Sequence, residues 1–78
     1  MLTPQPYPLF LAQVPDGTGH LPTVFRVVGW ADEGGSWLPV VIGEEAQQGP
    51  ATTITADGIY AENADAARAL ARERIPGH

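Results

Sequence analysis

The sequence predicts an α+β fold: three to four antiparallel strands, centred on a hairpin at residues 23–43, followed by one C-terminal helix over residues 64–75. Before residue 63, short runs rich in β-branched and aromatic residues alternate with glycine-containing turns, which is typical of strands. After it, the chain is rich in alanine, leucine, arginine and glutamate, which favour helix. Strands followed by a helix predict that the helix packs on one face of the sheet.

Length and composition predict one small domain over residues 1–78. The chain is 44% apolar and 17% charged, a balance typical of folded rather than disordered chains. It contains no cysteine, which excludes disulfides and thiolate metal sites. So short a chain has a thin stability margin, and with disulfides excluded, oligomerisation is the remaining common remedy.

The N-terminal part is rich in proline. Residues 1–6 are expected to form an extended tail, because Pro4 and Pro6 oppose a helix. Residues 7–14 are expected to form a strand at a sheet edge, since Pro8 cannot donate a ladder hydrogen bond. Residues 15–22 contain Pro-Asp-Gly and predict a loop.

The central hairpin contains both tryptophans of the chain, in the runs TVFRVVGW and SWLPVVIG on either side of a glycine-containing turn. A four-residue loop would place Trp30 directly opposite Trp37, whereas a two- or three-residue loop would shift the pairing. Alternation of side chains gives two faces, and within each strand this assignment does not depend on the register. One face is wholly apolar and is the expected core: Phe25, Val27, Gly29, Leu38, Val40 and Ile42. The other carries Val24, Arg26, Val28, Trp30, Trp37, Pro39 and Val41.

The rest of the chain predicts a polar loop at 43–51, strands at 52–55 and 59–62, and a turn or bulge at 56–58 between them. Asn63 is the expected helix N-cap, and Pro76 is the expected stop signal. Acidic and basic residues near the helix ends suit its dipole: Asp65 at the start, Arg72 and Arg74 at the end. The expected apolar stripe is Ala64, Ala67, Leu70, Ala71 and Ile75.

Charge limits the classes of partner. The net charge is −5, there is no lysine, and three of the four arginines lie in the last eleven residues. An acidic body disfavours nucleic acid and anionic membranes, and suits a basic protein surface. No run reaches the roughly 18–20 apolar residues of a membrane helix. The proline-interrupted start lacks the basic segment of a secretory signal, so a cytoplasmic location is expected.

Catalytic and metal-binding constellations are incomplete. The loop GTGHLP at 17–22 lacks the third glycine and the following helix of a phosphate-binding loop. His20 has no neighbouring metal-ligand pattern, and the single serine, Ser36, would need His20 and Asp16 to form a triad. Glu44 and Glu45 point in opposite directions in an extended loop. We therefore expect no enzyme activity, no metal, no cofactor and no small-molecule substrate.

The hairpin faces supply the functional hypothesis. One narrow, alanine-rich helix covers only one apolar face, and the sequence does not determine which one. An uncovered apolar face typically marks a contact with a partner or with another subunit. The expected partner-binding residues are Val24, Arg26, Val28, Trp30, Trp37 and Val41. The two alternatives for the tryptophans are burial in the core and a cross-strand pair that stabilises the hairpin.

The leading hypothesis is a small acidic, non-enzymatic protein–protein interaction module. It would act as an accessory or inhibitory protein that binds a protein partner or forms a homodimer. One alternative is a module that binds single-stranded nucleic acid, in which Arg26, Trp30 and Trp37 stack on bases. A third class, a small enzyme or metal protein, would need His20 beside a cluster of carboxylates.

Overall fold

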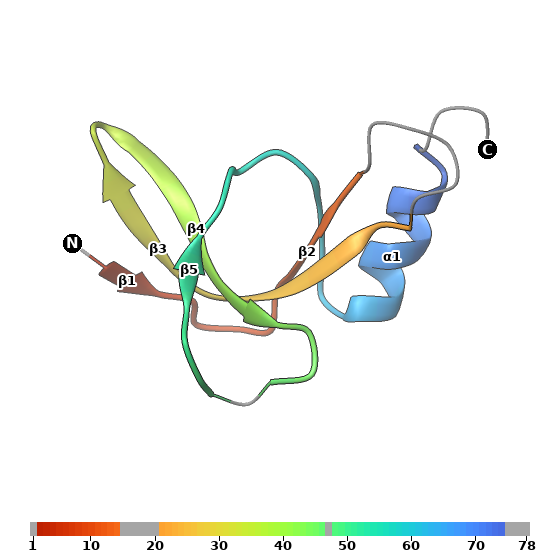
Figure 1. Cartoon of the computed structure of the whole chain (residues 1–78), viewed down its shortest axis with the longest axis horizontal. Coiled ribbons are helices and arrows are strands. Elements are labelled where there is room, and N and C mark those ends of the chain that lie inside the picture. The colour runs from red at the N-terminus through yellow and green to blue at the C-terminus, as the bar shows by residue number, and fades with distance from the viewer. Residues whose placement is uncertain (1, 15–20, 47, 75–78) are drawn as a thin grey trace.

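The computed structural model describes residues 2–14, 21–46 and 48–74. Over these ranges one antiparallel sheet of six strands is followed by a single helix (Figure 1). The strand order is β5-β4-β3-β2-β6, and β1 also pairs with β3. The elements are β1 (Leu2–Pro4), β2 (Phe10–Gln13), β3 (Thr23–Glu33), β4 (Ser36–Gly43), β5 (Thr52–Thr53), β6 (Ile59–Ala61) and α1 (Ala64–Arg72). The α+β prediction is confirmed in outline, with more strands than the three or four expected.

The β3–β4 hairpin is closed by a two-residue turn, Gly34 and Gly35, whose φ angles are 62° and 92°. Two consecutive positive φ angles suit the right-handed twist of a tight hairpin, and glycine adopts them without strain. With this turn, Trp30 lies opposite Pro39, and Trp37 lies opposite Asp32. The predicted pairing of Trp30 with Trp37 is wrong, because the loop is two residues long and not four.

A β-bulge at Val28 interrupts the hairpin. Val27 pairs with Val41 and Gly29 pairs with Val40, so Val28 has no partner in β4. Val41 and Val40 are adjacent in β4 and point to opposite faces, so their partners Val27 and Gly29 also point to opposite faces. In a regular strand Val27 and Gly29 would share a face, so the bulge reverses the alternation for the rest of β3. Trp30 therefore lies on the same face as Val27. Trp30 shares a face with Trp37 and Pro39 as predicted, but the predicted assignment is wrong for the half of β3 before the bulge: Val24 and Arg26 lie on the opposite face, because the bulge breaks the alternation within the strand itself.

The N-terminal segment runs along the other side of β3 in two pieces. β1 pairs with residues 29–31, and β2 pairs with residues 23–26. Residues 2–4 are extended as predicted, but they are paired in the sheet and do not form a free tail. Between the two strands, two backbone hydrogen bonds hold the segment to β3, from Gln5 N to Val28 O at 3.1 Å and from Val27 N to Leu9 O at 2.9 Å. Pro8 lies in this stretch and not in the strand predicted for residues 7–14, because proline lacks the donor that a regular ladder needs.

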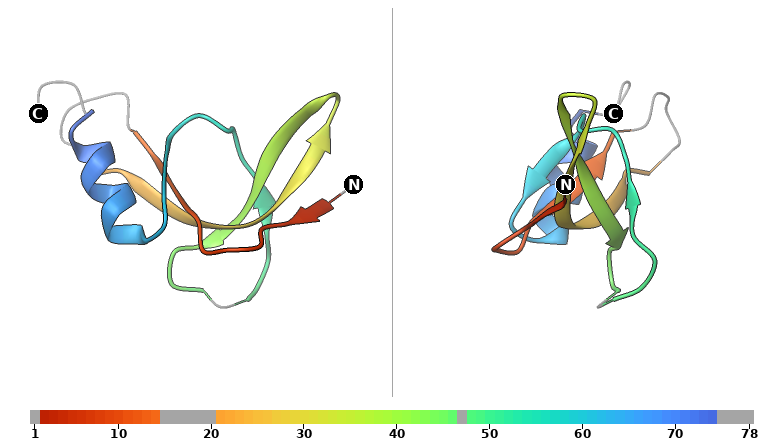
Figure 2. Two further views of the ribbon diagram at one scale, coloured as in Figure 1. Left: turned by 180° about the vertical axis from the view of Figure 1, so that it is seen from behind. Right: turned by 90° about the vertical axis from the view of Figure 1, so that its left-hand side faces the viewer.

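The sheet buries both of its faces, but with different covers. On one face α1 packs over β2, β6 and the start of β3 (Figures 1 and 2), and the buried residues there are Ala12, Val24, Ala67 and Ala71. On the other face lie Leu11, Val27 and Val41. Ile54, which directly follows β5, and Tyr60, in β6, pack against them. The helix therefore covers the face of Val24, and the chain itself covers much of the opposite face.

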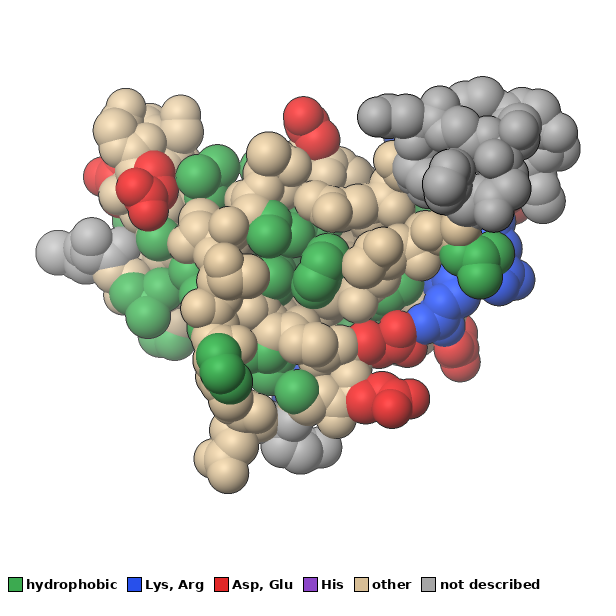
Figure 3. All heavy atoms as spheres, in the orientation of Figure 1, with side chains coloured by type: hydrophobic (Ala, Val, Ile, Leu, Met, Phe, Trp, Pro, Cys, Tyr) green, Lys and Arg blue, Asp and Glu red, His purple; other side chains and the backbone are tan. Residues whose placement is uncertain are grey.

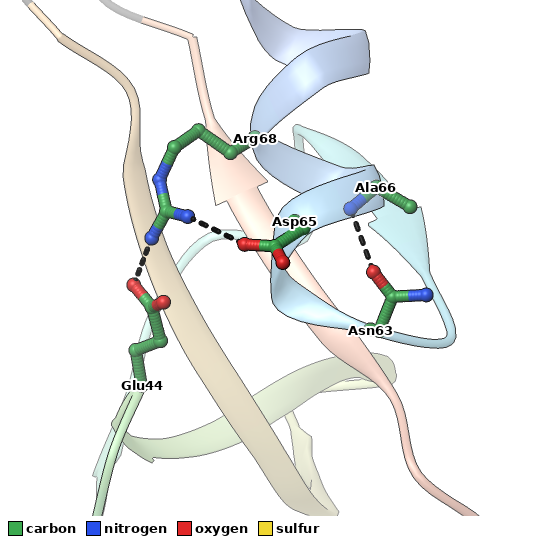
Figure 4. A network of polar contacts seen from close by, with 5 residues as sticks. All are labelled: Glu44, Asn63, Asp65, Ala66 and Arg68. Atoms are coloured by element: carbon green, nitrogen blue, oxygen red, sulfur yellow. Dashed lines mark hydrogen bonds and ion pairs between the residues drawn. The ribbon is translucent and has the colours of Figure 1, made fainter.

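Asn63 caps α1 as predicted, with its side-chain oxygen accepting a hydrogen bond from Ala66 N at 2.7 Å (Figure 4). The helix ends at Arg72, three residues before the predicted end; Ile75 and Pro76 lie outside the described residues. Leu70 was expected in the apolar stripe but is 45% exposed. The small alanines at 67 and 71 face the sheet, and this narrow contact leaves Leu70 outside it.

A second contact fixes the helix to the sheet. Arg68 donates one hydrogen bond to Glu44, which directly follows β4, and another to Asp65 in the first turn of α1 at 3.3 Å (Figure 4). The hydrogen bond to Glu44 raises the pKa of Arg68 further above its usual range. Glu44, expected in a polar loop, is therefore tied to the helix by an ion pair.

Candidate protein-binding surface

Trp30 and Trp37 border a shallow hollow near the end of the β3–β4 hairpin. The hollow measures about 220 Å³ and is lined by these two rings and Thr3. We call this group (Thr3, Trp30 and Trp37) the tryptophan hollow. Trp37 is 49% exposed, whereas Trp30 is only partly exposed. The tryptophans meet as diagonal neighbours on one face and not as a directly opposed pair.

The ring of Trp30 is held from two sides. Its Nε1 donates a hydrogen bond of 2.8 Å to the side-chain oxygen of Gln5. Its ring centroid lies 6.0 Å from that of Tyr60, with 31° between the planes, a separation typical of interacting aromatic pairs. Burial, together with the charge of Asp57, raises the pKa of Tyr60 above its usual value, so this phenol stays neutral at physiological pH.

Thr3 comes from β1, where it pairs with Trp30. Sequence reasoning missed this residue, because Pro4 and Pro6 led to the prediction of an extended tail over residues 1–6. The strand preference of threonine is the one signal in its favour, and it is weak over three residues. β2 pairs only with residues 23–26 of β3, and β1 pairs with residues 29–31 along the same edge.

The six predicted partner-binding residues do not form one surface. Val24 and Val41 are buried, at 7% and 1% exposure, in the two opposite cores. Arg26 and Val28 lie beside a different hollow of about 270 Å³, bordered also by the segment Gln5–Pro8. The six residues thus separate into Trp30 and Trp37 at one hollow, Arg26 and Val28 at another, and two valines in the cores. The grouping of all six on one face is wrong because the bulge at Val28 divides β3 into two halves with opposite alternation.

Negative charge lies next to the tryptophan hollow. Asp32 is directly opposite Trp37, on the face that carries both tryptophans, while Glu33 follows on the other face. The sequence between Arg26 and Arg68 contains no lysine or arginine. Figure 3 shows acidic side chains at the hairpin turn without basic ones around them, whereas acidic and basic side chains adjoin each other near the helix.

The other chemistry-bearing residues do not converge. Among the residues that the structure describes, no group of three or more His, Cys, Asp or Glu side chains is placed to hold a metal ion. His20, Asp16 and the loop at 15–20 lie outside the described residues. Ser36 starts β4 opposite Glu33. Within the same ranges, no helix is both long and apolar enough to cross a membrane.

The tryptophan hollow is thus the feature on which a functional argument can be built. It combines one half-exposed ring, one ring held in place by hydrogen bonding and stacking, and an adjacent carboxylate. No family model matches this sequence, and no curated protein or solved structure shows a significant similarity to it.

Proposed function

We propose that this chain is a non-enzymatic protein–protein interaction module that binds a partner through the tryptophan hollow. The half-exposed ring of Trp37 carries the proposal. Tryptophan is the residue type most enriched at the energetic centres of protein interfaces, where it fills a pocket or lines one. A large aromatic ring left open beside a second ring is also costly to keep in water unless it serves a contact.

The surroundings of the hollow favour binding because they are already ordered. Trp30 is held by Gln5 and Tyr60, and Pro39, opposite Trp30, is fully buried. The two-residue turn fixes the hairpin with a hydrogen bond of 3.2 Å from Gly35 N to the Asp32 carboxylate. A surface that is ordered before it binds loses less conformational entropy on association.

The charge near the hollow favours a basic protein over a second copy of this chain. A two-fold dimer uses the same patch from both subunits, which would bring the two Asp32 carboxylates toward each other. Each copy also carries a net charge of −5. Complementary charge on a basic partner speeds the encounter, whereas two acidic copies repel. The homodimer expected from the sequence is therefore an outcome that the experiment below can reveal.

The alternative of a nucleic-acid module receives less support. It required Arg26 beside both tryptophans, and the register places Arg26 on the other face of the sheet, opposite Ile42. A phosphate at the hollow would meet Asp32 and no nearby cation of the hairpin. Single-strand binders need a positively charged groove along the backbone.

The proposal is tested by comparing Trp37→Ser with Leu70→Ser, which removes a similarly exposed apolar side chain from the helix. Proteins retained by the immobilised full chain are purified, and their affinity for each variant is measured by calorimetry. We expect at least tenfold weaker binding for Trp37→Ser, as at a hot spot, and no significant change for Leu70→Ser.

Sedimentation velocity over a range of concentrations shows whether the free protein associates with itself. We expect a monomer at every concentration. A dimer that disappears in Trp37→Ser would replace the basic partner with a second copy. Equal binding by both variants would remove the tryptophan hollow from any interface.

A further inference from the structure

The position of Asp32 relative to the two rings defines the chemistry of the tryptophan hollow. Asp32 is the cross-strand partner of Trp37, and directly opposed residues of an antiparallel pair have Cβ atoms about 4.5–5.5 Å apart. Trp30 precedes Asp32 by two residues on the same side of β3. Asp32 does not itself line the hollow, but its position places a carboxylate next to Trp37 on the face that carries both indole rings.

This carboxylate has no cationic partner within the described residues. Both ion pairs seen there involve Arg68, near the helix. One oxygen of Asp32 accepts the hydrogen bond from Gly35 N, and the residue as a whole is exposed to solvent. The faces of indole rings are themselves electronegative and attract cations. The hollow therefore combines two sources of attraction for positive charge, and no lysine or arginine side chain pairs with Asp32 among the described residues.

We propose that the tryptophan hollow receives a cationic side chain, lysine or arginine, from a basic partner protein. The apolar part of the side chain packs against the ring of Trp37, and the charged head pairs with Asp32. This inference rests on the proposed function, because it assigns the ligand chemistry of the same surface. It identifies the partner residue by charge complementarity, since a purely apolar ligand would leave Asp32 at the rim of the interface without a partner.

The direct test uses short peptides and the two indole N–H resonances of the ¹⁵N-labelled full chain. The probes are acetyl-Gly-Lys-Gly-amide, acetyl-Gly-Arg-Gly-amide and a neutral peptide with norleucine at the centre. Trp37→Phe assigns the indole resonances without removing the aromatic ring. We expect both cationic peptides to shift the Trp37 resonance and to bind about two- to fivefold more tightly than the norleucine peptide. This preference should shrink as salt is added.

Asp32→Asn and Glu33→Gln form a matched pair of variants. Each removes one negative charge from the same end of the hairpin, but only Asp32 lies on the tryptophan face. Asparagine still offers a side-chain oxygen to Gly35 N, so the turn is preserved. We expect Asp32→Asn to reduce the preference for cationic peptides to the part that the indole rings provide, and Glu33→Gln to leave it unchanged. The amide resonances of residues 30–37 report whether the hairpin stays intact in each variant.

Three results would overturn the inference: equal binding of the norleucine peptide, equal effects of the two acidic variants, or no shift of the Trp37 resonance with any probe. The proposed function is judged separately. If Trp37→Ser weakens binding of the purified partner and Asp32→Asn does not, the tryptophan hollow is still the binding surface, but the inference that it receives a cationic side chain is wrong. If the peptides bind as expected but no protein partner depends on Trp37, the ligand chemistry stands and the proposed function fails.

Discussion

The two halves of β3 show how one strand serves two purposes. Before the bulge at Val28, Val24 is buried beneath the alanines of α1. After the bulge, Trp30 is only partly covered and its neighbour Trp37 is half exposed, with the three-residue strand β1 alongside. The helix is too short to reach the hairpin end (Figure 1). The domain therefore builds its core at one end and leaves an aromatic surface at the other.

The polar groups of the two ends differ in the same way. At the helix end, Asn63 caps the helix and Arg68 is paired with Glu44. At the hairpin end, Asp32 has no cationic partner within the described residues, and the side-chain nitrogen of Gln5 is buried without a hydrogen bond among them. The helix end pairs its polar groups within the sheet and helix, whereas the hairpin end has polar groups without partners among the described residues.

The largest expected effect separates the two strands that pair with the same side of β3. Leu11 in β2 is completely buried, and Leu11→Ala should lower the free energy of unfolding by about 2–5 kcal/mol. Leu2 in β1 is 62% exposed, and Leu2→Ala should change the free energy of unfolding by no more than about 0.5 kcal/mol. Urea unfolding followed by circular dichroism measures both. A similar loss for Leu2→Ala would mean that β1 stabilises the hairpin end as strongly as the core does.

A second pair of substitutions tests how rigid each end is. A Cβ atom at Gly58 would lie 2.6 Å from Leu11 Cδ1 and 2.7 Å from the carbonyl oxygen of Ala12, both in the buried strand β2. Its φ of 149° is also unfavourable for alanine. We expect Gly58→Ala to cost about 2–4 kcal/mol, because overpacking adds to backbone strain.

Two other glycines separate these causes. Gly49 has a φ of 140° but open space around it, so Gly49→Ala measures backbone strain alone. At Gly29 a Cβ would lie 2.8 Å from the carbonyl oxygen of Thr3, in the exposed strand β1. If β1 yields easily, Gly29→Ala should cost about 1 kcal/mol, the lower end of the overpacking range. Equal unfolding free energies for Gly58→Ala and Gly29→Ala would show that the hairpin end is as rigid as the helix end.

The helix end was largely predictable from the sequence. Asn63 caps the helix as predicted, and Asp65 and Arg72 lie at the ends that the helix dipole favours. The chain bends at Ala56 and Gly58, within the segment 56–58 where a hairpin turn or a bulge was predicted, but β5 and β6 pair with different strands, so no hairpin forms there. These features depend on local chemistry, such as a capping side chain or a glycine turn, which short segments of sequence contain in full.

The hairpin end was not predictable in the same way. The run Val27-Val28-Gly29-Trp30 fits a regular strand, and the bulge arises only because the two-residue turn and the pairing of Val27 with Val41 must both be satisfied. Sequence alternation therefore grouped Arg26 with the tryptophans and missed Asp32 and Thr3. The prediction that Trp30 lies near Trp37 is confirmed, because a loop of two residues in place of four shifts the pairing by two residues, and a shift of two keeps both rings on one face. The bulge at Val28 lies before this part of β3 and does not affect the pairing there.

The stability of the tryptophan variants bears most directly on function. Trp37 is half exposed, and no side-chain hydrogen bond or stacked aromatic ring is seen for it among the described residues. Trp37→Ser should therefore lower the free energy of unfolding by no more than about 1 kcal/mol, as is usual for an exposed site. Trp30→Ser should lower it by more, because it removes the hydrogen bond to Gln5 and the contact with Tyr60. Urea unfolding of both variants measures the difference, and a loss above about 2 kcal/mol for Trp37→Ser would mark this ring as part of the core.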